Sequence, residues 1–248
     1  MKTFESLSDA ASRLTQSVNA ISFGHPTSYV YNPLNYAWAI HEQYLKLAGQ
    51  AKKKAVLLGM NPGPFGMAQT GVPFGEITAV RDWMGLRGEV EKPIPEHPKR
   101  PVDGLACTKS EVSGRRLWGL FSEKFPDAKD FFEDHFVANY FPLVFMEESG
   151  RNRTPDKLPV SEKKPLEKVC DQYLREIVEI LEPDWLIGVG GFAKKRAEEV
   201  FENREQIEIS RYFERLPKST TVAAEELVED ELFFRKPSEE EEDNTEIK

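Results

Sequence analysis

Three short apolar runs, each bounded by turn-forming residues, most constrain what this chain can fold into. They cover residues 55–60, 136–145 and 185–189. Runs this short and this uniformly apolar are typical of strands that a sheet buries on both faces. Helical patterns lie between and around them, at residues 34–50, 115–125, 166–181 and 193–201. The alternation predicts an α/β fold with three layers, α/β/α, around a central, mostly parallel sheet whose functional loops follow the carboxyl ends of the strands.

The pattern of elements weakens after about residue 202, and this sets the expected domain boundary. We expect residues 1–202 to form one folded domain and residues 203–248 to be a divergent, acidic and largely disordered segment. Residues 225–248 hold eleven acidic and three basic side chains, so they carry −8 of the net charge of −9. The remainder is close to neutral, and a low overall charge does not exclude a nucleic-acid partner, because phosphates bind local basic groups.

Cysteine content and hydropathy exclude several other classes of protein. The two cysteines, Cys107 and Cys170, are too few for a disulfide framework, a four-cysteine zinc site or a cysteine-ligated iron–sulfur cluster held by this chain alone. No apolar segment follows the first residues, and the longest charge-free stretch is broken by prolines. We therefore expect neither a secretory signal nor a membrane span, and an intracellular protein.

The loop after the first apolar run, residues 59–76, is the most informative segment for function. Its prolines fix the backbone and its glycines admit a closely approaching ligand. It matches neither of the glycine-rich patterns that cradle phosphates. Asn61 lies among apolar groups such as Phe65, Met67 and Phe74, where a plain turn would be polar. An amide beside aromatic faces suits a planar, neutral, hydrogen-bonding ligand such as a nucleobase, although a tight turn with core anchors remains an alternative.

The letters of this loop, GMNPGPFGMAQTGVPFGE, resemble the first active-site motif of the single-strand-selective monofunctional uracil-DNA glycosylases. The resemblance continues at residues 81–83, 113–118, 136–143, 149–155 and 188–190. It implies the uracil-DNA glycosylase fold, with a mostly parallel four-stranded sheet whose last strand and helix the sequence leaves open. It also implies a nuclear, monomeric hydrolase of base excision repair that needs no cofactor or metal. Such an enzyme removes uracil, and 5-substituted uracils such as 5-hydroxymethyluracil, from single- and double-stranded DNA.

The resemblance also assigns roles to residues of the pocket. Asn61 holds the attacking water, and Asn139 reads the flipped base through its amide. Phe74 stacks on the base, while Met60 and Gly63 line the pocket. Gly63 is expected to leave space for a 5-substituent.

Two further segments are expected to contact the DNA backbone, one on each side of the pocket. They are Ser113, Gly114 and Arg115 in the first segment, and Ser149, Gly150, Arg151 and Asn152 in the second.

The sequence departs from the family at its second motif, a His-Pro-Ser-Pro stretch whose His stabilises the leaving base. No histidine follows His135, and the nearest equivalents are Pro217 and Ser219, with Leu216 or Arg215 at the position of the His. Removing one donor to a developing anion costs about 10²–10³ in rate. We therefore expect base recognition to persist and turnover to fall, above all on duplex DNA.

Two other functions remain open from the sequence. One is a non-catalytic binder of uracil-containing or abasic DNA. The other is a dinucleotide enzyme, because residues 188–193 fit a GxGxxA pattern after an apolar run. No acid stands at a convincing distance to bind a ribose, which argues against the second alternative.

Overall fold

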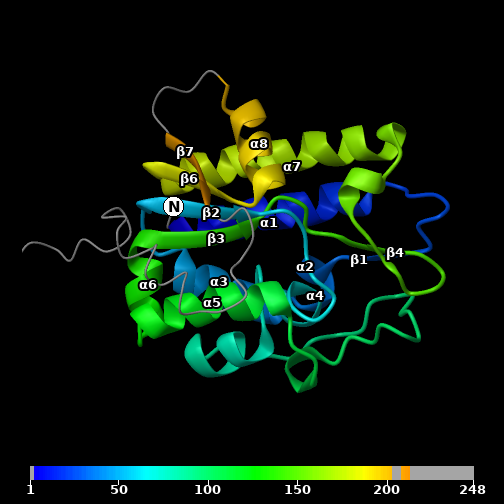
Figure 1. Cartoon of the computed structure of the whole chain (residues 1–248), viewed down its shortest axis with the longest axis horizontal. Coiled ribbons are helices and arrows are strands. Elements are labelled where there is room, and N and C mark those ends of the chain that lie inside the picture. The colour runs from blue at the N-terminus through cyan, green and yellow to red at the C-terminus, as the bar shows by residue number, and fades with distance from the viewer. Residues whose placement is uncertain (1–2, 203–207, 213–248) are drawn as a thin grey trace, which may run out of the picture.

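The central sheet of the computed structural model consists of four parallel strands in the order β3-β2-β6-β7 (Figure 1). The structure describes residues 3–202 and 208–212. The strands are β2 (Ala55–Gly59), β3 (His135–Asn139), β6 (Trp185–Val189) and β7 (Glu208–Tyr212). The expected α/β class and parallel four-stranded sheet are confirmed. The fourth strand, β7, comes from the segment expected to lie beyond the domain. Residues 203–207 and 213–248 of that segment lie outside the described part.

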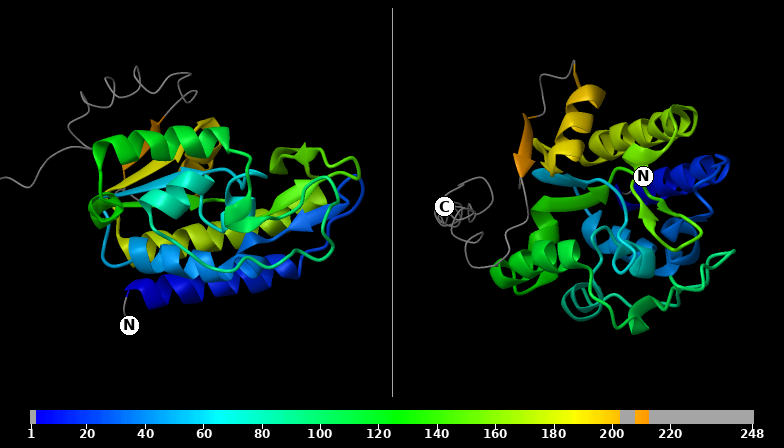
Figure 2. Two further views of the ribbon diagram at one scale, coloured as in Figure 1. Left: turned by 90° about the horizontal axis from the view of Figure 1, so that it is seen from below. Right: turned by 45° about the vertical axis from the view of Figure 1, so that its right-hand side comes forward.

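Helices cover both faces of this sheet. In Figure 2, α5 (Val112–Lys124) lies on one side, and α7 (Val160–Leu181) and α3 (Trp38–Ala48) lie on the other. Helix α1 (Thr3–Asn19) packs on α7 as an outer helix. Helix α8 (Gly191–Val200) packs directly on β6 and β7. The remaining helical elements are shorter: α2 (Pro33–Tyr36), α4 (Met67–Thr70), η1 (Ala79–Trp83), η2 (Gly104–Ala106), α6 (Ala128–Asp134) and η3 (Pro155–Lys157).

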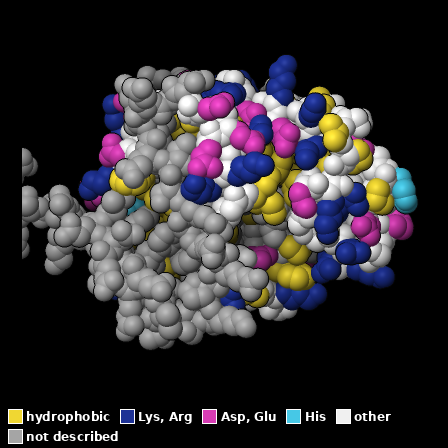
Figure 3. All heavy atoms as spheres, turned by 45° about the horizontal axis from the view of Figure 1, so that its top comes forward, with side chains coloured by type: hydrophobic (Ala, Val, Ile, Leu, Met, Phe, Trp, Pro, Cys, Tyr) yellow, Lys and Arg dark blue, Asp and Glu magenta, His cyan; other side chains and the backbone are white. Residues whose placement is uncertain are grey.

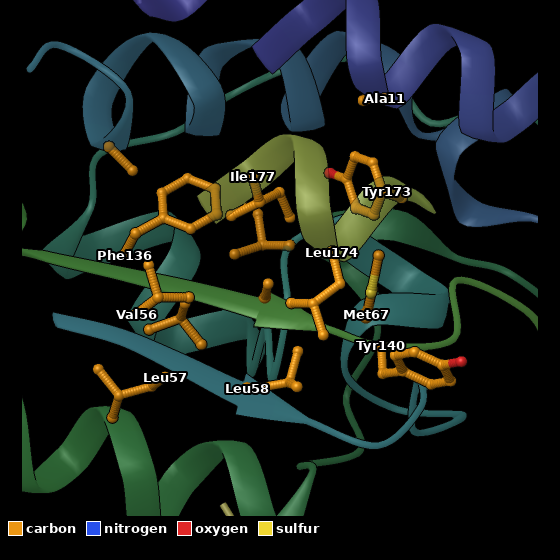
Figure 4. Packing of buried hydrophobic residues seen from close by; sticks show 14 of the residues in the cluster. Ala11, Val56, Leu57, Leu58, Met67, Phe136, Tyr140, Tyr173, Leu174 and Ile177 are labelled. Carbon is orange, nitrogen blue, oxygen red and sulfur yellow. The ribbon is translucent and has the colours of Figure 1, made fainter. Parts of the chain in front are cut away.

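The core explains why strands β2 and β3 read as continuous apolar runs. Every residue of both strands is buried, because helices cover both faces. In Figure 4, Val56 and Leu57 point to opposite faces of β2, and Leu174 and Ile177 of α7 lie over the face that Val56 shares. The alternation of strand side chains thus feeds two apolar layers at once.

A second, antiparallel sheet lies at one end of the molecule. Its strands are β1 (Tyr29–Tyr31), β4 (Val144–Met146) and β5 (Asn152–Arg153), in the order β1-β4-β5. The turn between β4 and β5 carries residues 147–151, and the long loop of residues 84–111 runs past the same end of the molecule (Figure 1).

Helix boundaries differ from the sequence-based expectation at two places. Helix α7 begins at Val160, six residues before the apolar pattern starts at Leu166, because the helix accommodates Pro165 in its second turn. The amphipathic helix α1 was not expected from the sequence, although Leu7, Leu14 and Val18 form one buried face. No helix in the described residues is long and apolar enough to cross a membrane.

Strand β3 is the edge of the central sheet, and a single hydroxyl pairs with its free side at Val137. Tyr44 of α3 donates to Val137 O (2.6 Å) and accepts from Val137 N (3.2 Å), so it replaces the missing neighbouring strand at that residue. Tyr44 is fully buried, and burial raises its pKa. An unpaired backbone edge would otherwise be left inside the core.

Replacing Tyr44 with Phe should therefore lower the free energy of unfolding by about 1–3 kcal/mol, since two buried backbone groups lose their partner. Urea denaturation measures the difference. Tyr173→Phe is the matched control, because Tyr173 is also buried and no hydrogen bond of its hydroxyl is found among the described residues. Equal effects of the two substitutions would contradict this account of the β3 edge.

Candidate active site

The loop of residues 60–76 leaves the carboxyl end of β2 beside the end of β3. The parallel register places Gly59 opposite Asn139. Beyond the strands the pairing continues, since Tyr140 N donates to Gly59 O (2.9 Å) and Phe141 N donates to Met60 O (2.8 Å). Met60 is half-buried and packs on the core. The two asparagines that the sequence singled out, Asn61 and Asn139, thus follow neighbouring strands at one edge of the sheet.

Three buried aromatic or imidazole rings hold the loop by its carbonyl groups. Each ring donates one hydrogen bond, and each accepting carbonyl belongs to the second half of the loop. The bonds run from Tyr36 Oη to Ala68 O (2.6 Å), from His41 Nδ1 to Gly71 O (2.8 Å) and from Trp118 Nε1 to Pro73 O (3.2 Å). The loop is therefore anchored to α2, α3 and α5 and does not depend on its own residues alone.

Helix α5 packs against the part of the loop that carries Phe74. A Cβ atom on Gly114, in the first turn of α5, would overlap the carbonyl oxygen of Phe74. Phe74 itself has a left-handed backbone, with φ of 54°, which is unusual for a bulky residue. The close approach of α5 fixes the peptide that follows this strained residue.

Glu111, directly before α5, holds the other half of the loop. Its carboxylate lies against Gly63, and its aliphatic stem lies against Gly66. Burial raises the pKa of Glu111, and the backbone N–H groups of Phe65 and Ser113 partly offset this by donating to the carboxylate. Sequence analysis did not identify Glu111. Its position directly before the helix whose first turn carries Ser113 and Gly114 was the available signal.

Asn139 and Phe74 face the same point in space. A Cβ atom on Gly59 would clash with Asn139 Oδ1 and would lie 2.5 Å from the Phe74 ring. The Asn139 side chain is 7% exposed, and its Oδ1 has no hydrogen-bond partner among the described residues. Its Nδ2 donates to the thioether of Met67 at 3.2 Å, a weak acceptor. The unpaired amide oxygen beside an aromatic ring is free to accept a hydrogen bond from a ligand.

Asn61 lies two residues beyond the end of β2, at the start of the loop. It is half-buried, and its Nδ2 donates to the neighbouring Pro62 O at 3.1 Å. Its Oδ1 remains available to a water molecule or ligand within the described structure. Gly63 was expected to leave space for a 5-substituent. The space where its Cβ would lie is occupied by the Glu111 carboxylate.

A hydrogen-bonded network fixes the residue after Asn139. The Tyr140 hydroxyl donates to Asp171 Oδ1 of α7 (2.5 Å) and accepts from Arg196 Nε of α8 (2.9 Å), while Arg196 also pairs with Asp171. Burial and the neighbouring carboxylate raise the pKa of Tyr140. Through this network, α7 and α8 hold Tyr140 and so fix the backbone next to Asn139.

The residues expected to contact DNA phosphates differ in how accessible they are. Ser113 and Arg115 reach the surface of α5, while Gly114 between them is buried and serves the packing on Phe74. Ser149 and Arg151 are exposed on the β4–β5 turn.

Gly150 and Asn152 are less accessible. Gly150 has φ of 82°, and a Cβ there would lie 2.8 Å from the His97 ring. Asn152, in β5, is half-buried with Oδ1 unpartnered among the described residues. The positions equivalent to the second motif, Arg215, Leu216, Pro217 and Ser219, lie outside the described residues.

The glycine pattern after β6 has a packing explanation. A Cβ on Gly188 would collide with the backbone of Lys194, so the glycine lets α8 lie directly on β6. In residues 3–202 and 208–212, no group of three His, Cys, Asp or Glu side chains is arranged to hold a metal ion. Both cysteines are free, with Cys107 half-buried and Cys170 buried.

The two glycines of α5 provide a direct test of how this helix supports the pocket. Gly114→Ala should lower the free energy of unfolding by about 1–3 kcal/mol, because the new methyl group must displace α5 from Phe74. Gly119→Ala is the matched control, since nothing lies within 4 Å of its Cβ position and alanine favours the helix by up to about 1 kcal/mol. Urea denaturation measures the free energy of unfolding of both variants. A decrease for Gly114→Ala with an increase for Gly119→Ala would support this account, and equal changes would refute it.

The His41 bond to the loop makes stability depend on pH. Burial lowers the pKa of His41 from 6.5 to about 4, although its bond to Gly71 acts in the opposite direction. The unfolded chain therefore binds a proton that the folded protein rejects, so stability is complete above pH 6.5 and falls as the pH approaches 4. The expected loss is about 3 kcal/mol. His41→Asn retains a donor near Nδ1 and should lose less stability between pH 7.5 and pH 4.5. Equal losses in urea denaturation would contradict the assignment.

Comparison with known proteins agrees with this geometry. A sequence profile described as "Uracil DNA glycosylase superfamily" matches residues 48–231. The chain is 48% identical over 185 residues, or 75% of its length, to the Single-strand selective monofunctional uracil DNA glycosylases of Mus musculus and Bos taurus. That alignment covers 66% of the mouse protein, slightly under two thirds, and 68% of the bovine protein.

A solved structure supports the fold independently of close sequence similarity. The crystal structure of wild-type Pedobacter heparinus SMUG2 superimposes with a TM-score of 0.59 at 15% identity, covering 89% of this chain and 95% of that one. From the profile match and the 48% identity, the chain belongs to the uracil DNA glycosylase superfamily and, within it, to the family of the single-strand selective monofunctional uracil-DNA glycosylases.

Proposed function

We propose that this protein hydrolyses the N-glycosidic bond of uracil in DNA and so begins base excision repair. The observation that carries the proposal is the buried, unpartnered Asn139 Oδ1, which meets the Phe74 ring at Gly59. The names of the related proteins support the same reaction.

The polarity of the Asn139 amide favours uracil over cytosine. Its Oδ1 would accept from uracil N3–H, and its Nδ2 would exchange the Met67 sulfur for the stronger acceptor O4. Cytosine reverses both polarities and would leave buried groups unpaired, at a cost of about 1–3 kcal/mol each. Stacking on Phe74 would add about 1–3 kcal/mol without regard to sequence.

Glu111 offers a basis for selecting among 5-substituted uracils. Its carboxylate beside Gly63 would accept a hydrogen bond from a 5-hydroxymethyl group. The methyl group of thymine would instead desolvate the carboxylate and return no hydrogen bond, which is unfavourable. This contrast supports 5-hydroxymethyluracil as a second substrate and the exclusion of thymine.

Asn61 would act by orienting the attacking water. An amide cannot remove a proton from water, so the glycosidic bond must break largely before water adds, through an oxocarbenium-like sugar. The loop of residues 59–76 contains no lysine, so it offers no amine to form a Schiff base with the abasic sugar. Hydrolysis without strand cleavage fits this composition.

Several finer expectations rest on the resemblance and remain predictions. These are action on both single- and double-stranded DNA, reduced turnover without the second-motif histidine, a nuclear location and a monomeric state. The absence of a histidine after His135 also keeps one alternative open, namely binding of uracil-containing or abasic DNA without catalysis.

Release of free uracil from a single-stranded oligonucleotide tests the proposal and separates it from this alternative. The wild type should release uracil, and Asn61→Ala should do so about 10²-fold more slowly, because the water loses its orientation. Gly119→Ala, which leaves the pocket untouched, should match the wild type. Retention of DNA with no free base, in single-turnover conditions, would favour the binder and refute the glycosylase.

A further inference from the structure

Two cationic groups from another segment lie over the ring of Phe65, in the loop after β2. The Arg100 guanidinium carbon is 5.5 Å from the centre of the Phe65 ring, and Lys109 Nζ is 4.9 Å from it. Both cations belong to the long connection between η1 and α5, whose role the sequence did not reveal. The two charges therefore lie within about one Debye length of each other and act on the same volume of solvent.

Arg100 also joins this loop to the β4–β5 turn. Its Nε donates to Gly150 O at 2.8 Å, next to the exposed Arg151. The segment is held from below by the Tyr31 hydroxyl, which donates to Arg100 O (3.0 Å) and accepts from His97 N (2.6 Å). These bonds fix both the backbone and the side chain of Arg100.

These cations have no carboxylate partner among the described residues, although many others on the surface do. Three of the nearby acids are already engaged, since Glu147 pairs with Arg153, and Glu96 and Asp103 pair with Lys92. Glu148, on the β4–β5 turn, is exposed and is the acid closest in sequence to Arg151. Glu111 directs its carboxylate to the backbone of Phe65 and Ser113. In Figure 3, lysine and arginine side chains lie along the right-hand end of the molecule, with acidic side chains among them.

We propose that Arg100 and Lys109, which lie over Phe65, together with Arg151, which follows the Gly150 that Arg100 binds, form a binding site for the backbone phosphates of the DNA strand that enters the pocket. We call these four residues the Phe65 ridge. Because Phe65 follows Asn61 by only four residues, a strand lying on the ridge passes directly beside the pocket. Phosphates are the matching ligand, since the ridge offers fixed positive charge and no acceptor for a base edge. This inference rests on the proposed function for the identity of the polyanion.

The salt dependence of binding is the measurement that isolates phosphate contacts. Each phosphate neutralised on single-stranded DNA contributes about 0.7 to the slope of log affinity against log salt. Arg100→Gln/Lys109→Gln removes two charges and should make the slope shallower by about 1.4. The affinity ratio of wild type to variant for single-stranded oligothymidylate should then fall about sevenfold between 50 and 200 mM salt.

Two control variants distinguish the ridge from general charge and from folding. Lys52→Gln/Lys129→Gln removes the same charge from exposed positions at the opposite end of the strands, and its slope should equal that of the wild type. Arg100→Lys keeps the charge but loses the Nε bond to Gly150, and its slope should also be unchanged. Fluorescence anisotropy on the full-length chain, with circular dichroism to verify folding, provides these values.

The result that overturns the ridge is an unchanged slope in the Arg100→Gln/Lys109→Gln variant. A slope changed equally by Lys52→Gln/Lys129→Gln would also overturn it, since the effect would then belong to net charge. Uracil release by the wild type is scored separately: its absence would refute the glycosylase and leave the oligothymidylate result valid.

Discussion

The parallel pairing of β2 with β3 is the constraint on which the rest of the site depends. It places Gly59 opposite Asn139, and two further backbone bonds extend the pairing past both strand ends. Gly59 has to lack a side chain, because the Asn139 amide and the Phe74 ring occupy the space where a Cβ would be. A shift of register by one residue would turn Asn139 to the other face of the sheet and dissolve the pocket.

Three helices around this strand pair hold the loop that follows β2. Helix α5 contributes Trp118 and Gly114 to one half of the loop, while Glu111 before it serves the other half. Helices α2 and α3 contribute Tyr36 and His41. Such support from several elements is what pre-organises a recognition site, since the groups need not be ordered again when a ligand arrives.

The strands, the loop and the placement of Asn61 and Asn139 after neighbouring strands could be predicted from the sequence, because each depends on local pattern or on a general rule of parallel sheets. Other features depend on contacts between distant residues, which no local pattern encodes. The start of α7 was misplaced because Pro165 imitates a helix boundary. Gly114 and Gly150 were expected to contact DNA. In the structure, Phe74 lies where a side chain of Gly114 would be, and His97 lies where a side chain of Gly150 would be. Glu111 was missed because its partner, Gly63, is nearly fifty residues away.

The left-handed backbone of Phe74 has a thermodynamic consequence. A bulky residue in that conformation costs of order 1–3 kcal/mol, which the surrounding contacts must supply. This backbone conformation lasts only while the loop is folded, so the shape of the site and the folding of the loop depend on each other. Any small molecule that occupies the space between ring and amide will, by linkage, raise the melting temperature of the protein, and calorimetry alone then suffices to rank candidate bases.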